Sequence, residues 1–127
     1  DGGKIRLQSS LPAVTGFQSF PLLLRPPTLA TIDTDSEKIA RRTILAQDKH
    51  GHTMVILFDT APITLHDAAQ VLLLAELNLD WALNLDGGPS TGAIAKDGEH
   101  QIHVLPAAEL PIVISAKRVS EASPNGQ

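Results

Sequence analysis

Only one stretch of this chain carries the 3.6-residue apolar period of an amphipathic helix, which limits the folds open to it. Apolar residues recur at helical spacing from Leu65 to Leu77. Thr64 precedes them with a hydroxyl placed to accept from the amide three residues on, and Asn78 tolerates the left-handed backbone that often ends a helix. Because strand-like runs dominate the rest, the sequence predicts an α+β fold, with a mostly antiparallel or mixed sheet packed against one main amphipathic helix.

The predicted strands are short and are bounded by turn signals. Strands are expected at residues 4–8, 81–85, 100–105 and 112–116. The clearest hairpin pairs residues 42–47 with residues 53–58, across a turn in which Gly51 can adopt positive φ. The apolar stretch 17–24 contains Pro21, which has no amide to donate, so it is predicted to be an edge strand or a buried loop.

The composition is typical of one globular domain and excludes several classes of partner. With 127 residues, 43% hydrophobic and 19% charged, the chain is expected to form a single domain over residues 1–127 with a disordered tail at 120–127. A net charge of −4 disfavours nucleic acid as a partner. The longest apolar runs fall far short of the ~20 residues that a membrane span needs. Because there is no cysteine, a thiol nucleophile and a disulfide are both excluded.

The most unusual local sequence is the corner that follows the predicted strand 81–85. Asn84 and Asp86 are two residues apart, so strand alternation places their side chains on one face. Gly87 and Gly88 allow the backbone to approach a ligand closely, and the residues after them offer hydroxyls and amides. The structural alternative is an Asx-type turn, in which Asp86 accepts from its own downstream amides. Trp81, beside this corner, is expected in the core.

Metal-ligating residue types occur here, but not at the spacing of a known metal site. The candidates are the pairs His50 with His52 and His100 with His103, and the run Asp33, Asp35 and Glu37. The first pair lies in or beside a turn, and the spacing of the second sends its rings to opposite faces of a strand. The acidic run lacks the glycine and the final glutamate of an EF-hand loop, which predicts a solvated loop. No metal and no cofactor is therefore expected.

Three segments of the chain carry a resemblance to a known family. They are NLDGGPST at residues 84–91, which follows TLHDAAQVLLLAELNLDWA at residues 64–82, QSFPLLL at residues 18–24, and RRTILAQDKHGHTMVILFD at residues 41–59. In this order and spacing they resemble the phosphodiester glycosidase family, over roughly residues 17–118. The resemblance implies hydrolysis of a sugar-1-phosphodiester between the anomeric carbon and the phosphate. It also implies an exported or cell-envelope protein that acts on a small sugar phosphodiester or on a polysaccharide.

The resemblance also implies which residues form the site. Carried over residue by residue, they are Gln18, Ser19, Arg42, Thr43, Asn84, Asp86, Gly87, Gly88, Ser90 and Thr91. Pro89 departs from the family pattern, because it has no amide to offer a phosphate. Family domains also carry an upstream Asn-Gly-Gly-Phe-like segment that this sequence lacks. The chain, which opens at Asp1 without Met, is therefore expected to be a processed piece, the C-terminal part of the domain.

The implied chemistry assigns a role to each main residue. A phosphate leaves the anomeric carbon with little protonation, so the greater need is to stabilise an oxocarbenium-like carbon. Asp86 is expected to stabilise that charge or to activate water, while Arg42 holds the diester through a bidentate contact. Asn84 and Ser90 would orient oxygen atoms of the substrate. Two alternatives remain open: a non-catalytic carbohydrate- or phosphate-binding module, and an assembly fragment that pairs with an upstream segment or a second copy.

Overall fold

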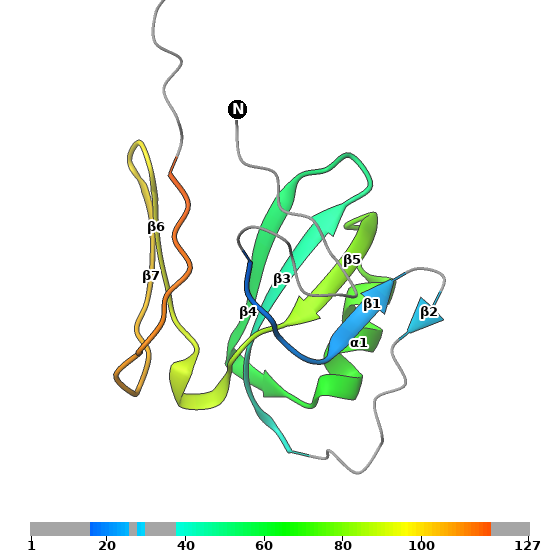
Figure 1. The fold of residues 1–127 in the computed structure, drawn as a ribbon, viewed down its shortest axis with the longest axis horizontal. Helices are drawn as coiled ribbons and strands as arrows, with labels where there is room; N and C mark the ends of the chain where they lie inside the picture. Colours follow the sequence, from blue (N-terminus) through cyan, green and yellow to red (C-terminus); the bar gives the residue numbers. More distant parts are fainter. Residues whose placement is uncertain (1–15, 26–27, 30–37, 118–127) are drawn as a thin grey trace, which may run out of the picture.

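The longest paired strands in the part of the chain that the structure describes form an antiparallel hairpin (Figure 1). The computed structural model describes residues 16–25, 28–29 and 38–117. Within this part, β3 (Ala40–Asp48) pairs with β4 (Thr53–Ile63). Gly51 has a φ of 88° in the turn between them, which glycine adopts without steric cost. The predicted hairpin is thus confirmed, whereas the predictions for residues 4–8, for the acidic run at 33–37 and for the tail at 120–127 lie outside the described residues.

The hairpin belongs to a five-stranded sheet with the order β2-β1-β5-β3-β4. Here β1 (Leu22–Arg25) lies between the short β2 (Thr28–Leu29) and β5 (Leu79–Asn84), and it is antiparallel to both. The sequence predicted an edge strand or a buried loop for this segment, but β1 is an interior strand. Pro21 lies just before β1, so its missing amide removes no hydrogen bond from the strand itself.

The helix α1 (Leu65–Leu74) begins where the sequence predicts. The Thr64 hydroxyl accepts a hydrogen bond from the Asp67 amide at 3.0 Å, which satisfies one of the free amides of the first turn. The helix ends at Leu74 rather than at Asn78. Asn78 does adopt a left-handed backbone, with a φ of 50°, but it does so in the connection to β5. The end of the helix therefore differs from the prediction.

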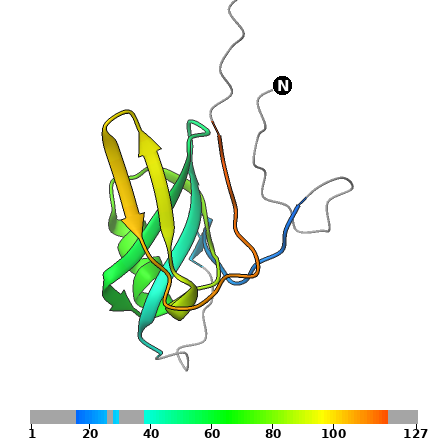
Figure 2. The same cartoon turned by 90° about the vertical axis from the view of Figure 1, so that its left-hand side faces the viewer.

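A second sheet consists of the hairpin of β6 (Ala93–Asp97) and β7 (His100–Val104). A short 3₁₀ turn, η1 (Gly88–Ser90), leads into it from β5. Figure 1 shows this hairpin as a separate ribbon on the β4 side of the main sheet, and in Figure 2 it lies in front of that sheet. The sequence predicted β7 but not β6. The strand predicted at residues 112–116 is wrong, because these residues form no strand and are exposed.

The predicted α+β class is also wrong, because the described part of the chain is mostly β. It contains two antiparallel sheets and one helix of ten residues. Only three helix residues are buried, Ala68, Ala69 and Leu72. The rest of the buried core cluster comes from strands β1, β3 and β5: Leu23, Leu24, Ile44, Ala46, Leu79 and Ala82. The apolar periodicity overstated the contribution of the helix to the core, because it includes leucines that are exposed in the tertiary structure.

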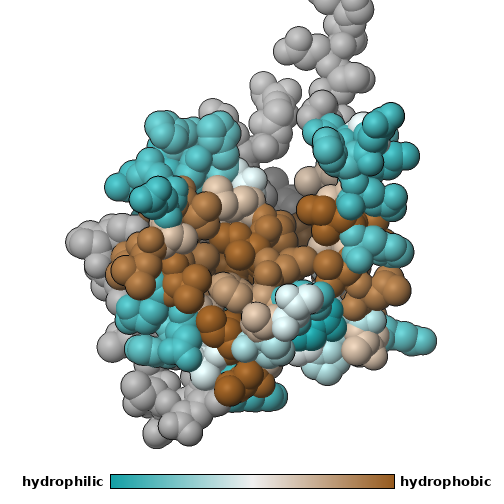
Figure 3. Space-filling view, turned by 180° about the vertical axis from the view of Figure 1, so that it is seen from behind, coloured by the Kyte–Doolittle hydropathy of each residue, from teal (hydrophilic) through white to brown (hydrophobic). Residues whose placement is uncertain are grey.

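Three of the exposed leucines lie at the end of α1 and just after it. Leu73 and Leu74 of α1 and Leu77 after it are 41%, 79% and 39% exposed. Figure 3, in which the molecule is seen from behind, shows hydrophobic residues gathered in a broad patch on that face. Trp81 instead is only 4% exposed, and its Nε1 donates to Gln47 Oε1 at 3.3 Å. Trp81 is therefore part of the core, as predicted, and is not available to stack on a sugar.

Candidate functional site

The corner after β5 is built by two adjacent glycines with different constraints. A Cβ atom on Gly87 would lie 2.7 Å from the Arg41 carbonyl oxygen, which is closer than real Cβ atoms approach a neighbouring atom. Gly88 has a φ of 59°, in the region that favours glycine. The Ser90 amide then donates to the Gly87 carbonyl at 3.1 Å, which closes η1. The two glycines therefore let the chain turn tightly against the start of β3.

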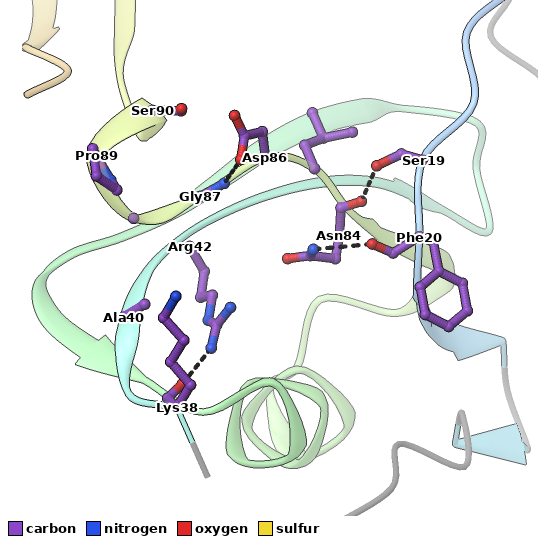
Figure 4. A pocket seen from close by; sticks show the side chains of 12 residues that line it. Ser19, Phe20, Lys38, Ala40, Arg42, Asn84, Asp86, Gly87, Pro89 and Ser90 are labelled. Atoms are coloured by element: carbon purple, nitrogen blue, oxygen red, sulfur yellow. Dashed lines mark hydrogen bonds between the residues drawn. The ribbon is translucent and has the colours of Figure 1, made fainter. Parts of the chain in front are cut away.

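This corner forms one wall of a solvent-open cavity of about 530 Å³ (Figure 4). Its other walls come from the segment before β1 and from the start of β3. The lining residues are Ser19, Phe20, Lys38, Ala40, Arg42, Asn84, Leu85, Asp86, Gly87, Gly88, Pro89 and Ser90. The volume lies within the range of about 300–1,000 Å³ typical of small-molecule sites. Segments that are distant in the sequence thus meet at one polar pocket.

Asp86 is exposed at the rim of this pocket. Its Oδ1 accepts a hydrogen bond from the Gly87 amide at 2.9 Å, and within the described part of the chain its carboxylate makes no other. An Asx turn would instead bond amides further along the chain. Because β5 ends at Asn84, strand alternation no longer applies, and Figure 4 shows the Asp86 and Asn84 side chains pointing in different directions. The carboxylate is therefore accessible to a ligand.

Arg42 lies in the same pocket, but its guanidinium contacts the protein backbone. Its Nε donates to the Ile63 carbonyl at 3.0 Å, and its Nη2 donates to the Lys38 carbonyl. Burial lowers the pKa of Arg42, because desolvation disfavours the charged form. Figure 4 shows the guanidinium pointing toward Lys38 and away from Asp86. Arg42 thus ties the chain before β3 to the end of β4.

Asn84 is held on several sides by the segment before β1. Its Nδ2 donates to the Phe20 carbonyl at 3.3 Å, its amide donates to the Pro21 carbonyl, and its carbonyl accepts from Ser19 Oγ at 2.6 Å. The residue is only 8% exposed, and its buried Oδ1 has no hydrogen-bond partner among the described residues. Such atoms are rare in folded proteins and call for a specific explanation.

The remaining residues implied by the sequence lie in two different places. Gly88 and Ser90 line the pocket, and Figure 4 shows the Ser90 hydroxyl pointing to the side where Asp86 lies. Gln18 is exposed and is not part of the pocket lining. Thr43 and Thr91 are buried beyond it, and their hydroxyls have no partner among the described residues. The structure therefore brings most of the predicted residues together but not these three.

Lys38 is the lining residue of greatest chemical interest that sequence reasoning missed. No role in the site was expected for it from the sequence, yet Lys38, Ala40 and Arg42 all line the pocket. Alternate residues of an extended segment point to the same side. The alternation that runs back from Arg42 through Ala40 is therefore the sequence signal that points to Lys38.

The described residues hold no group of three or more His, Asp or Glu side chains arranged to bind a metal ion. His50 and His52 are exposed at the β3–β4 turn, and His100 and His103 are exposed on β7. His52 Nδ1 lies 2.8 Å from Asp48 Oδ2, so that histidine is engaged with its own turn. In the same part of the chain, no helix has the length and apolar character needed to cross a membrane.

The chain matches the family model for phosphodiester glycosidase over residues 5–118, which is most of its length. This chain belongs to the phosphodiester glycosidase family. The resemblance noted in the sequence is thereby confirmed, and the match includes the β3–β4 hairpin and the glycine corner. Family membership supports a glycosidase, a kind of hydrolase, and a sugar fits as its substrate. No curated protein and no solved structure matches the chain.

Proposed function

We propose that this member of the phosphodiester glycosidase family hydrolyses a sugar-1-phosphodiester between the anomeric carbon and the phosphate. The observation that carries the proposal is the accessible Asp86 carboxylate at the rim of a polar pocket that also contains the amino group of Lys38. A pocket that offers both an acid and a cation suits a substrate whose carbon becomes positive while its leaving group is an anion. Family membership supports the general class, and the pocket suggests the bond that is cleaved.

The reaction balances with water as the only co-reactant. The bond between the anomeric carbon and the bridging oxygen breaks, and its electron pair leaves with the phosphate. The oxygen of a water molecule bonds to the carbon, and the proton it loses is taken by Asp86. Because a phosphate monoester is a weak base, its departure requires little help from a general acid. A single accessible carboxylate is therefore sufficient for the main catalytic demand.

Hydrolysis in ¹⁸O-labelled water tests which bond is cleaved. The full chain is incubated with sugar-1-phosphodiesters, and the products are analysed by mass spectrometry. Cleavage at carbon puts the label on the free sugar and leaves the phosphomonoester unlabelled. Label on the phosphate would show attack at phosphorus and contradict the proposal.

The same assay separates the alternative functions. Binding of sugar phosphodiesters without any turnover would support a non-catalytic carbohydrate- or phosphate-binding module. Turnover that appears only when an upstream segment or a second copy is supplied would support an assembly fragment. Turnover by the chain on its own would contradict both alternatives.

A further inference from the structure

The pocket contains two cationic side chains in very different situations. The guanidinium of Arg42 is buried and donates to the carbonyls of Ile63 and Lys38. Lys38 is exposed, and its ammonium makes no hydrogen bond or ion pair with any described residue. A charge-assisted contact to a phosphate needs a cation with free donors. Lys38, which is exposed, therefore meets this requirement better than the buried guanidinium of Arg42 does.

The position of Lys38 depends on Arg42. The bond from Arg42 Nη2 to the Lys38 carbonyl holds the backbone of Lys38 beside the start of β3. Figure 4 shows the Lys38 amino group pointing toward the turn that carries Gly87 and Pro89. Arg42 is thus placed to orient Lys38 rather than to reach the substrate.

Asn84 also lines the pocket, but it offers a hydrogen-bond acceptor where Lys38 offers donors. Because its Nδ2 donates to the Phe20 carbonyl, the amide is oriented with Oδ1 as a buried, unpartnered acceptor. An acceptor oxygen repels the oxygens of a phosphodiester, which are acceptors themselves and carry no proton at neutral pH. A sugar hydroxyl, in contrast, has a proton to donate. Asn84 Oδ1 therefore matches the sugar and not the phosphate.

We propose that the pocket binds its substrate in one direction, with the phosphate on the Lys38 ammonium and a sugar hydroxyl donating to Asn84 Oδ1, while Arg42 is a positioning residue for Lys38. This proposal rests on the proposed function for the identity of the substrate. It adds the orientation of that substrate, and it transfers the phosphate contact from Arg42 to Lys38.

Binding of methyl phosphate to the full chain, measured by titration calorimetry, tests the Lys38 contact without any turnover. Lys38→Met keeps the apolar stem and removes the charge, and Lys49→Met at the exposed β3–β4 turn is the matched control. We expect Lys38→Met to weaken methyl phosphate binding about tenfold or more and to reduce its salt dependence. Lys38→Arg should restore most of the affinity, and Lys49→Met should bind like the wild type. Unchanged binding by Lys38→Met would overturn the proposal.

A double-mutant cycle tests the role of Arg42. If Arg42 acts through Lys38, then Arg42→Lys weakens methyl phosphate binding in the wild-type background but not in the Lys38→Met background. Equal losses in both backgrounds would contradict the positioning role. A general loss of folding would not produce this dependence on Lys38.

Monodeoxy sugars test the Asn84 contact. We expect the loss of one particular hydroxyl to weaken sugar binding about tenfold or more, because the buried acceptor then stays unpaired. Asn84→Ala should remove this discrimination, and an equal response to every deoxy sugar would overturn the contact. Failure of the proposed function gives a different result, since an inactive protein that still binds phosphate through Lys38 and the sugar through Asn84 would refute hydrolysis and leave the binding direction intact.

Discussion

Two aspartates in this protein each stand beside a glycine-containing turn, but their carboxylates are used differently. Asp48, at the β3–β4 turn, accepts from the amides of His50 and His52 at 2.8 Å each, and its second oxygen contacts the His52 ring. Asp86 accepts only from the Gly87 amide within the described part of the chain. The comparison shows an Asx-type turn at Asp48, whereas the carboxylate of Asp86 remains accessible.

The electrostatics of Asp48 follow from these bonds. Desolvation acts to raise its pKa, but the hydrogen bonds from the His52 side chain and from the amides of His52 and His50 outweigh it and lower the pKa. The charged form of Asp48 is therefore used to stabilise its turn. Four experiments compare residues of the pocket and its corner with residues outside them.

The largest effect is expected from exchanging the two carboxylates for amides. Asp86→Asn should lower kcat about a thousandfold, because the charged base and stabilising group is lost. Asp48→Asn, which makes the same change at the other turn, should leave kcat within about twofold of the wild type. Initial rates on a sugar-1-phosphodiester, together with thermal unfolding, measure both. A similar loss in the two variants would remove the distinction between the carboxylates.

A smaller effect is expected when the support of the pocket is removed. Arg42→Met leaves the carbonyls of Ile63 and Lys38 without their charged donor, and we expect a loss of about 3 kcal/mol in the free energy of unfolding. Arg41→Met, at the next position, breaks a partly exposed ion pair with Asp59 and should cost only about 0–1 kcal/mol. Urea unfolding measures both losses. A smaller loss for Arg42→Met than for Arg41→Met would contradict the structural role of Arg42.

The glycines of the two turns provide the next comparison. Gly87→Ala places a Cβ atom 2.7 Å from the Arg41 carbonyl oxygen, so the backbone must move, at a cost of about 2 kcal/mol. It should also lower activity, since the corner carries Asp86. Gly51→Ala meets no atom within 4 Å but keeps a φ of 88°, which costs about 1 kcal/mol. Full activity in Gly87→Ala would show that the geometry of the corner is not needed for catalysis.

The smallest effect is the pH dependence of the β3–β4 turn. Because the pKa of Asp48 is lower in the folded protein, its stabilisation is complete above its unfolded pKa of about 3.9. It is lost as the pH falls through the folded value. The difference in unfolding free energy between the wild type and Asp48→Asn should therefore shrink in acid, as measured by urea unfolding from pH 7 down to pH 2. A constant difference over this range would contradict the role assigned to the charge.

The sequence predicted those elements whose signals are local. The β3–β4 hairpin, the Thr64 cap and the glycine corner each depend on residues a few positions apart, and each forms where it was expected. The end of α1, the interior position of β1 and the second sheet were not predicted. These depend on which segments pack together, and an apolar period in α1 cannot show whether a partner covers it.

The candidate site divides in the same way. Asn84, Asp86 and Gly87 were selected from a local motif, and all three line the pocket. Lys38 was missed, because its relation to the pocket depends on the strand that follows it. The roles of Asp86 and Arg42 in catalysis stay predictions, but the structure changes what Arg42 is placed to do.

By itself, the sequence determined the turns, the helix start and the family to which the chain belongs. Only the tertiary structure decided that the carboxylate of Asp86 stays accessible and that Lys38, rather than Arg42, is the exposed cation of the pocket. The partners of Asp48 lie within four residues of it, so that turn can close locally. The partner of the Arg42 guanidinium on β4 and the partner of the Asn84 amide before β1 are carbonyls that strand pairing brings from distant positions. Hydrogen bonds of this long-range kind form only when the sheet does, and they determine the chemistry that the pocket can offer.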